Sequence, residues 1–193
     1  MILSDTDIRR ALADRRIEID PAPLPEQFSP SALDFRVGYE FRRWKRQAPG
    51  VELSINLSEA SVPNYAEYTE EVPADHDGLV TIPKDDFVLA KTLERISLPL
   101  TSRLAARVEG RSTLARLGLA VHITAPIIHA GFRGPIVLEI KNLGPHRLRI
   151  EPGKTCICQV VFETLSSEPT GDLRTVFQDQ DDVLGRRDPC EDG

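Results

Sequence analysis

Two short stretches of the sequence carry side chains suited to chemistry. In residues 108–119, a glycine is followed within six positions by Arg111, Ser112, Thr113 and Arg116. Guanidinium and hydroxyl groups at this spacing can bind phosphate oxygens. The alternative is an ordinary solvated, charged face.

The second stretch, residues 131–139, ends an apolar run with a single carboxylate, Glu139. A charge among apolar residues is unfavourable unless it has a partner or a function. Burial there would raise the pKa of Glu139 toward neutrality, which suits a group that transfers protons. Alternatively, Glu139 is a solvated strand residue paired with Lys141. Together the two stretches indicate a nucleotide site with a carboxylate placed for proton transfer.

The elements that position these residues are expected to be short strands. Apolar segments of four to seven residues, separated by Gly, Pro and Asn, are typical of a β-sandwich or barrel. Ser4 and Asp7 resemble a capping box and predict a helix over about 5–15. Residues 112–117 predict one or two further helical turns, whose N-terminal N–H groups would face an anion. Strands are expected over 33–37, 78–83, 87–90, 104–108, 121–124, 136–140, 148–150 and 156–162.

Length and composition predict a single domain over residues 1–165, followed by an arm over 166–193. The arm is polar and acidic and contains few apolar residues. We expect a mobile lid whose last residues, about eight, are disordered, because such a segment cannot bury enough apolar surface to fold alone.

Charge and hydropathy exclude several partners. A net charge of −6 argues against nucleic-acid polymers. No apolar run approaches the ~20 residues that span a bilayer, and no signal peptide is visible. We therefore expect a cytoplasmic protein. Cys156, Cys158 and Cys190 form no disulfide framework and are expected to be small core residues, with no spacing typical of zinc ligands.

The sequence resembles the dCTP deaminase branch of the dCTP deaminase/trimeric dUTPase superfamily over roughly residues 4–163. No single motif is specific, but together they occur in the family's order with similar spacings. The motifs are SALDFRVG (31–38), EGRSTLARLGL (109–119), VHITAP (121–126), GFRG (131–134), LEI (138–140) and ICQ (157–159).

The resemblance implies a mainly β, distorted barrel of the dUTPase-like, β-clip type, assembled as a homotrimer with active sites shared between subunits. It implies hydrolysis of dCTP to dUTP and ammonia, with Mg²⁺ on the triphosphate, and dTTP as a possible feedback inhibitor. It also implies chemistry without zinc. Zinc deaminases use H-x-E and P-C-x-x-C motifs, and the sequence has neither.

The resemblance also implies roles for single residues. Glu139 would take a proton from the attacking water and give one to N3 of cytosine, a step worth ~10²–10⁴-fold. The Ser112 hydroxyl and the Ala125 carbonyl would position the water, and Arg116 would support the site electrostatically. The implied substrate-binding residues are Arg111, Ser112, Thr113, Leu114, Ala115, Arg116, Val137, Leu138, Glu139, Gln159 and Gln180. Among them, Arg111, Ser112 and Thr113 would bind phosphates, and the main chain at Val137 and Leu138 would read the base. Gln180 would reach the nucleotide from the arm, whereas Gln159 could also be an ordinary polar residue at a strand edge.

Two departures from the family pattern affect the prediction. His129 stands where many relatives and the dUTPases carry the Asp that, in dUTPases, activates water for attack on phosphorus. This argues against a bifunctional enzyme that continues to dUMP and diphosphate. In the arm, Val176 and Phe177 replace Lys and Tyr. A non-catalytic nucleotide-binding regulatory module is a further alternative, but Ser112, Arg116 and Glu139 together speak against it, because binding alone does not need all three.

Overall fold

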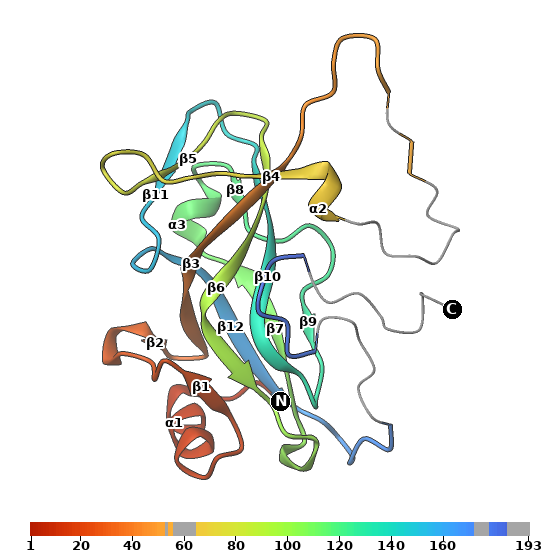
Figure 1. Cartoon of the computed structure of the whole chain (residues 1–193). Coiled ribbons are helices and arrows are strands. Elements are labelled where there is room, and N and C mark those ends of the chain that lie inside the picture. Colours follow the sequence, from red (N-terminus) through yellow and green to blue (C-terminus); the bar gives the residue numbers. More distant parts are fainter. Residues whose placement is uncertain (53, 56–64, 172–177, 185–193) are drawn as a thin grey trace, which may run out of the picture.

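The structure is a computed structural model that describes residues 1–52, 54–55, 65–171 and 178–184 (Figure 1). Strands dominate it. They are β1 (Glu18–Asp20), β2 (Phe28–Ser29), β3 (Ala32–Trp44), β4 (Thr69–Glu71), β5 (Val80–Ile82), β6 (Phe87–Ser97), β7 (Leu104–Gly110), β8 (Leu119–Ala120), β9 (Ile127–Ile128), β10 (Arg133–Asn142), β11 (Leu148–Ile150) and β12 (Cys156–Thr164). The helices are α1 (Asp5–Ala13), α2 (Tyr65–Tyr68), α3 (Ser112–Ala115) and the 3₁₀ turns Pro25–Gln27 and Leu100–Ser102.

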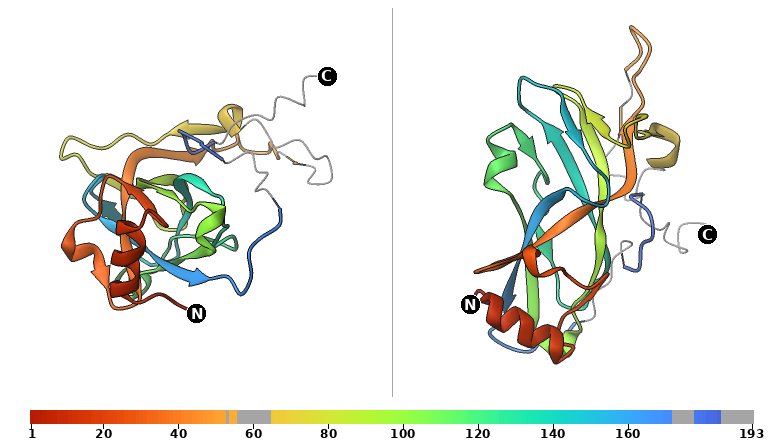
Figure 2. Two further views of the ribbon diagram at one scale, coloured as in Figure 1. Left: turned by 90° about the horizontal axis from the view of Figure 1, so that it is seen from below. Right: turned by 90° about the vertical axis from the view of Figure 1, so that its left-hand side faces the viewer.

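Ten strands form one antiparallel sheet in the order β8-β10-β6-β3-β12-β7-β9, with β1 added to β6 and both β2 and β4 added to β3. The remaining pair, β5 and β11, forms a small second sheet. The large sheet curls around a common core (Figure 2). Its largest fully buried side chains include Phe35, Phe41, Phe162, Leu33, Leu104 and Leu138. Tight curling of this kind is how an antiparallel sheet buries one apolar face without a second layer.

The helix expected at the N-terminus is present as α1. The Ser4 hydroxyl accepts the Asp7 N–H at 3.2 Å and donates to the Asp7 carboxylate at 2.8 Å, so the capping residues act as the sequence predicts. Ile8 and Ala11 are buried against the sheet. The helix ends at Ala13, two residues before the expected end, because Arg15 has a φ of 54° and leaves the helical region.

The strand expected over 121–124 is wrong: these residues form bends rather than a strand. The reason lies in the sheet topology. The preceding strand, β8, pairs with β10 at one end of the sheet, and the following strand, β9, pairs with β7 at the other end. Residues 121–126 therefore cross between the two ends of the curled sheet, and a crossing segment has no neighbouring strand with which to pair.

The other expected strands are present, several of them longer than the apolar runs that predicted them. β6, for example, continues past its expected end at Ala90 through Lys91, Glu94 and Arg95, and the fully buried Glu94 pairs with Arg36 of β3 at 2.7 Å. Within the described ranges, none of the helices is long and apolar enough to span a membrane.

A close main-chain crossing fixes the turn after α3. Gly118 has a φ of 90°, and a Cβ there would lie 2.2 Å from the Gly144 nitrogen. The Leu143 N–H donates to the Gly118 carbonyl at 2.7 Å, and the buried Asn142 side chain accepts the Gly144 N–H at 3.0 Å. The turn that carries α3 is thus tied to the end of β10 by groups that leave no room for a side chain.

We predict that Gly118→Ala lowers the free energy of unfolding by about 2–4 kcal/mol, because it combines an unfavourable φ with a main-chain clash. Chemical denaturation measures this. Gly171→Ala is the matched control, because no atom of the described residues, apart from the adjoining chain, lies within 4 Å of the Cβ that it adds. An equal, small effect of both substitutions would contradict the close crossing.

Candidate functional site

Glu139 lies on β10, on the face opposite to the core. Its neighbours Leu138 and Ile140 are fully buried, while Val137, Glu139 and Lys141 alternate onto the other face and are partly exposed. Burial raises the pKa of Glu139 above its usual range, and this effect outweighs the hydrogen bond from the Ile123 main chain and the nearby His122, which lower the pKa. The predicted shift of the Glu139 pKa therefore has its predicted cause, desolvation among apolar residues.

A cavity of about 320 Å³ opens beside Glu139. Ala125, Val137 and Gln180 also line it, so four residues that the sequence associates with the site meet at one place. His129 and several apolar side chains, including Ile127, Phe132 and Ile136, complete the wall. The segment that crosses between the sheet ends supplies Ala125, and β10 supplies Val137 and Glu139.

Two of these wall residues were not singled out by the sequence analysis. Phe132 stands in the GFRG motif, where an aromatic residue next to two glycines could have drawn attention. Ile127, in β9, is 60% exposed. Its position is set by the pairing of β9 with β7, and no local sequence pattern predicts this pairing.

Arg111 and Gln159 lie in a second cluster, organised by Asp34. The Asp34 carboxylate on β3 pairs with an Arg111 guanidinium nitrogen at 3.0 Å and accepts the Gln159 amide of β12 at 2.9 Å. Arg111 also donates to the Cys156 carbonyl at 3.1 Å. Asp34 is 7% exposed, so its charge is nearly buried and its partners are held in place. Asp34 has no predicted role, although the SALDFRVG motif contains it.

Five further predicted site residues lie on α3 or directly after it. Ser112, Thr113, Ala115 and Arg116 are exposed, and Leu114 is half-buried. The helix has only four residues, and its first turn closes through N–H groups of Leu114 and Ala115 that donate to the Arg111 carbonyl.

Within one chain the predicted site is divided. Among the described residues that line the Glu139 cavity, none lies in 111–116. In Figure 1, α3 lies beside β8 and β11, whereas β9, which helps to wall the cavity, lies at the other end of the sheet. The Leu138 side chain is fully buried in the core and takes no part in the cavity wall.

The two cysteines that the structure describes are free thiols next to the Asp34 cluster. Burial is the largest cause that raises the pKa of both Cys156 and Cys158, and nearby carboxylates raise it further. Both thiols stay protonated near neutral pH, which makes them packing residues rather than nucleophiles. Cys190, Val176 and Phe177 lie outside the described residues, as does the terminal part of the arm that is expected to be disordered.

Comparison with known proteins identifies the family. A family model described as dCTP deaminase-like matches residues 2–165. The chain belongs to this family.

Among relatives, the chain is 41% identical over 167 residues to a protein of Methanothermobacter thermautotrophicus named "dCTP deaminase, dUMP-forming", covering 86% of this chain and 80% of the relative. It is 39% identical over 168 residues to a protein of Natronomonas pharaonis named "dCTP deaminase". That match covers 86% of this chain and 82% of the relative. The crystal structure of 2'-deoxycytidine 5'-triphosphate deaminase from Agrobacterium tumefaciens superposes with a TM-score of 0.64 at 20% identity, over 84% of this chain and 48% of that one. This last likeness concerns the fold, and it confirms the predicted mainly β architecture with its few short helices.

Proposed function

We propose that this member of the dCTP deaminase-like family is an enzyme that hydrolyses the 4-amino group of dCTP and releases ammonia. The observation that carries the proposal is Glu139, a partly buried carboxylate with a raised pKa in the wall of a 320 Å³ cavity. The names of relatives that share about 40% of their residues with this chain support the same substrate.

In the proposed reaction, the Glu139 carboxylate takes a proton from a water molecule as that water attacks C4 of cytosine. It delivers this proton to N3, then takes the second proton from the new C4 hydroxyl and gives it to the amino group, which leaves as ammonia while the C4 carbonyl forms. The Ala125 carbonyl, in the same cavity wall, can accept a hydrogen bond from the attacking water. Val137 lies beside Glu139 in that wall, where its main chain can read the edge of the base.

The pH dependence follows from the direction of the pKa shift. Because the reaction starts from the carboxylate, activity should fall as the pH falls through the pKa of Glu139. Burial raises that pKa, so the acidic limb of kcat/KM should lie at a higher pH than for a solvated glutamate. A kcat/KM profile between pH 4 and 9 measures this. A flat profile down to the usual glutamate pKa would show that Glu139 is not the titrating group.

The phosphates would be bound by Arg111, Ser112 and Thr113. These are one cation and two hydroxyls, a set that fits a triphosphate whose Mg²⁺ is bound by the nucleotide rather than by carboxylates of the protein. Bound there, Mg²⁺ would neutralise phosphate charge. The pairing with Asp34 holds the Arg111 side chain toward Gln159, which is also proposed to contact the nucleotide.

We also propose that the enzyme is a homotrimer with shared active sites. The division of the site supports this, because Ser112 and Arg116 are absent from the described wall of the Glu139 cavity in their own chain. Exposed apolar side chains near both parts of the divided site also support the trimer. Leu117, beside α3, is 51% exposed; near the Glu139 cavity, Ile123 is 51% exposed and Ile127 is 60% exposed. In the proposed trimer, the neighbouring subunit would cover these side chains and remove their apolar surface from water. Inhibition by dTTP and a cytoplasmic location stay predictions of the sequence.

The product is either dUTP or dUMP with diphosphate. His129 in the cavity wall favours dUTP, because the resemblance places the water-activating Asp of dUTPases at this position. The dUMP product is favoured by relatives named "dUMP-forming", which include those of Methanothermobacter thermautotrophicus and Halobacterium salinarum.

Chromatographic separation of the nucleotides formed from dCTP tests this proposal. The assay contains Mg²⁺ and a zinc-selective chelator. We expect deaminated nucleotide to accumulate, and its phosphate number identifies the product. Loss of activity with the chelator, restored by zinc, would contradict the proposed mechanism.

A further inference from the structure

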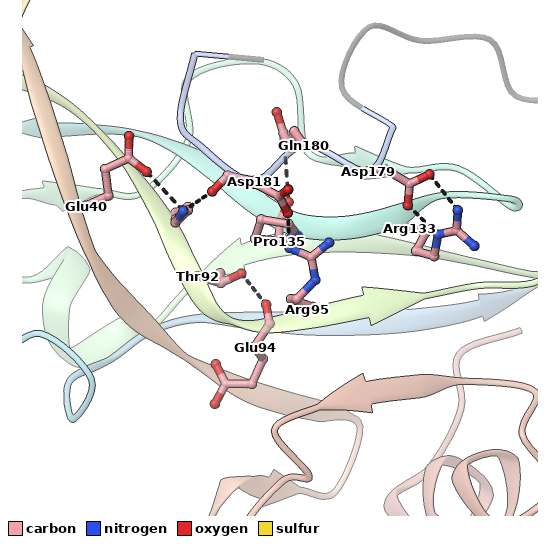
Figure 3. A network of polar contacts seen from close by, with 10 residues as sticks. Glu40, Thr92, Glu94, Arg95, Arg133, Pro135, Asp179, Gln180 and Asp181 are labelled. Carbon is pink, nitrogen blue, oxygen red and sulfur yellow. Dashed lines mark hydrogen bonds and ion pairs between the residues drawn. The ribbon is translucent and has the colours of Figure 1, made fainter. Parts of the chain in front are cut away.

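The described part of the arm, residues 178–184, lies along β10 and β6 of its own chain (Figure 3). We call it the docked segment. The Asp179 N–H donates to the Arg133 carbonyl at 2.8 Å, and the Arg133 N–H donates to the Gln178 side chain at 3.2 Å. The Gln178 amide donates in turn to the Gly131 carbonyl at 3.0 Å. The segment therefore begins with a pattern of main-chain and amide contacts that fixes its register against β10.

Two carboxylates flank Gln180 in this segment, and both are paired with arginines of the sheet. Asp179 accepts two hydrogen bonds from the Arg133 guanidinium, one of them at 2.6 Å. Asp181 pairs with Arg95 of β6 at 2.9 Å, and its carbonyl accepts a hydrogen bond from Lys91. The aspartates, which in isolation would repel a triphosphate, are thus neutralised by cations of the same chain.

Between these pairs, the Gln180 side chain turns inward. Gln180 is 3% exposed, donates to the Pro135 carbonyl at 3.2 Å and lines the Glu139 cavity. An irregularity in β10 between Pro135 and Val137 accompanies this contact, and the Thr92 hydroxyl accepts the Ile136 N–H there at 2.9 Å. The Gln180 side-chain oxygen is buried without a hydrogen-bond partner among the described residues. An unsatisfied acceptor of this kind is unfavourable unless a ligand or water completes it.

We infer that Arg133 and Arg95 are positioning residues, which dock residues 178–184 on their own chain and so hold Gln180 in the cavity of the same chain's Glu139. The catalytic consequence rests on the proposed function; the docking does not. The contacts described for the segment are made by the chain's own atoms, so we expect it to dock in the free protein. This differs from the mobile lid expected from the composition of the arm.

The first test is hydrogen exchange of the free protein, which needs no activity. Residues 178–184 should be protected in the wild type, and the double variant Arg95→Gln, Arg133→Gln should lose that protection. The KM for dCTP should rise about fivefold to tenfold with kcat within about twofold, since exposed ion pairs contribute modestly and act on binding here. A structural defect would instead lower kcat and the Tm.

Arg149→Gln is the matched control, because this arginine also pairs with two carboxylates, Asp75 and Asp77 at 2.7 and 2.9 Å, but on the small second sheet. It should change neither exchange nor KM. The charge swap Arg95→Asp with Asp181→Arg should restore the protection that Arg95→Asp alone removes. Unchanged protection in the double variant, or failure of the swap, would overturn the positioning role.

The second test asks whether Gln180 acts in the active site that contains Glu139 of its own chain or in the site of a neighbouring subunit. Subunits with Gln180→Ala and subunits with Glu139→Gln are assembled together and assayed at dCTP well below KM. If both side chains act within one chain, no site in the mixture has both, and activity should equal the average of the two parents. Recovery to about a quarter of wild type, as expected for random pairing of subunits, would show that Gln180 acts across the interface and would overturn the inference. If the wild type does not deaminate dCTP, the proposed function fails, while the exchange result still decides the docking.

Discussion

Glu139→Gln should lower kcat for dCTP deamination by ~10²-fold or more while changing dCTP affinity by only a few-fold. The amide keeps the size and polarity of the side chain in the cavity but can no longer accept a proton from water. Steady-state turnover and binding of dCTP by calorimetry measure the two effects separately. Glu163→Gln is the matched control, since Glu163 is also a strand glutamate, paired with Arg107 at 3.1 Å and absent from the described cavity wall.

The same variant should also change stability in a pH-dependent way. Burial raises the folded-state pKa of Glu139, so the protonated form is favoured by folding, and this contribution is lost as the pH rises through the folded pKa. At pH 8, Glu139→Gln should therefore have a higher Tm than the wild type, and below the usual glutamate pKa the two should coincide. Turnover within threefold of wild type would remove Glu139 from the mechanism, and a lower Tm at pH 8 would contradict its burial.

The second large effect concerns Arg116. Arg116→Gln alone should lower turnover by ~10²-fold, the usual cost of losing one preorganised charged donor. Because Arg116 and Glu139 lie in separate parts of one chain, each shared site is proposed to take them from different subunits. Subunits with Arg116→Gln and subunits with Glu139→Gln should therefore form active sites when mixed, recovering about a quarter of wild-type activity at random assembly.

Co-expression with two affinity tags and purification through both gives the mixed assembly. Each parent purified alone, then combined without subunit exchange, is the control and should stay inactive. No recovery in an assembly shown to contain both subunits would mean that both residues act within one chain, against the shared-site proposal.

The sequence predicted what depends on local chemistry. The capping residues of α1 and the apolar neighbours that raise the pKa of Glu139 are both visible in short stretches of residues. The helix α3 follows the predicted helical turns over 112–117 in the same way. The motif resemblance then predicted the fold class, which the family match and the structural comparison confirm.

What the sequence could not predict depends on contacts between distant segments. Asp34 is separated from Gln159 by 125 positions, and only the pairing of β3 with β12 brings their side chains together. The bends over 121–124 were expected to be a strand because their apolar residues alternate. Their true conformation follows from sheet order, since β8 and β9 lie at opposite ends of the sheet. The contacts of Asp179 and Asp181 likewise depend on arginines far away in the sequence.

Ammonia release from dCTP is the measurement that tests the central claim most directly. Purified protein is incubated with dCTP and Mg²⁺ in the presence of a zinc-selective chelator, beside Glu139→Gln at the same concentration. Our account predicts that the wild type releases one ammonia for each dCTP consumed and that the variant binds dCTP but releases almost none. Binding of dCTP by the wild type without ammonia release would contradict it, and the chain would then be a nucleotide-binding module that keeps the fold without the chemistry.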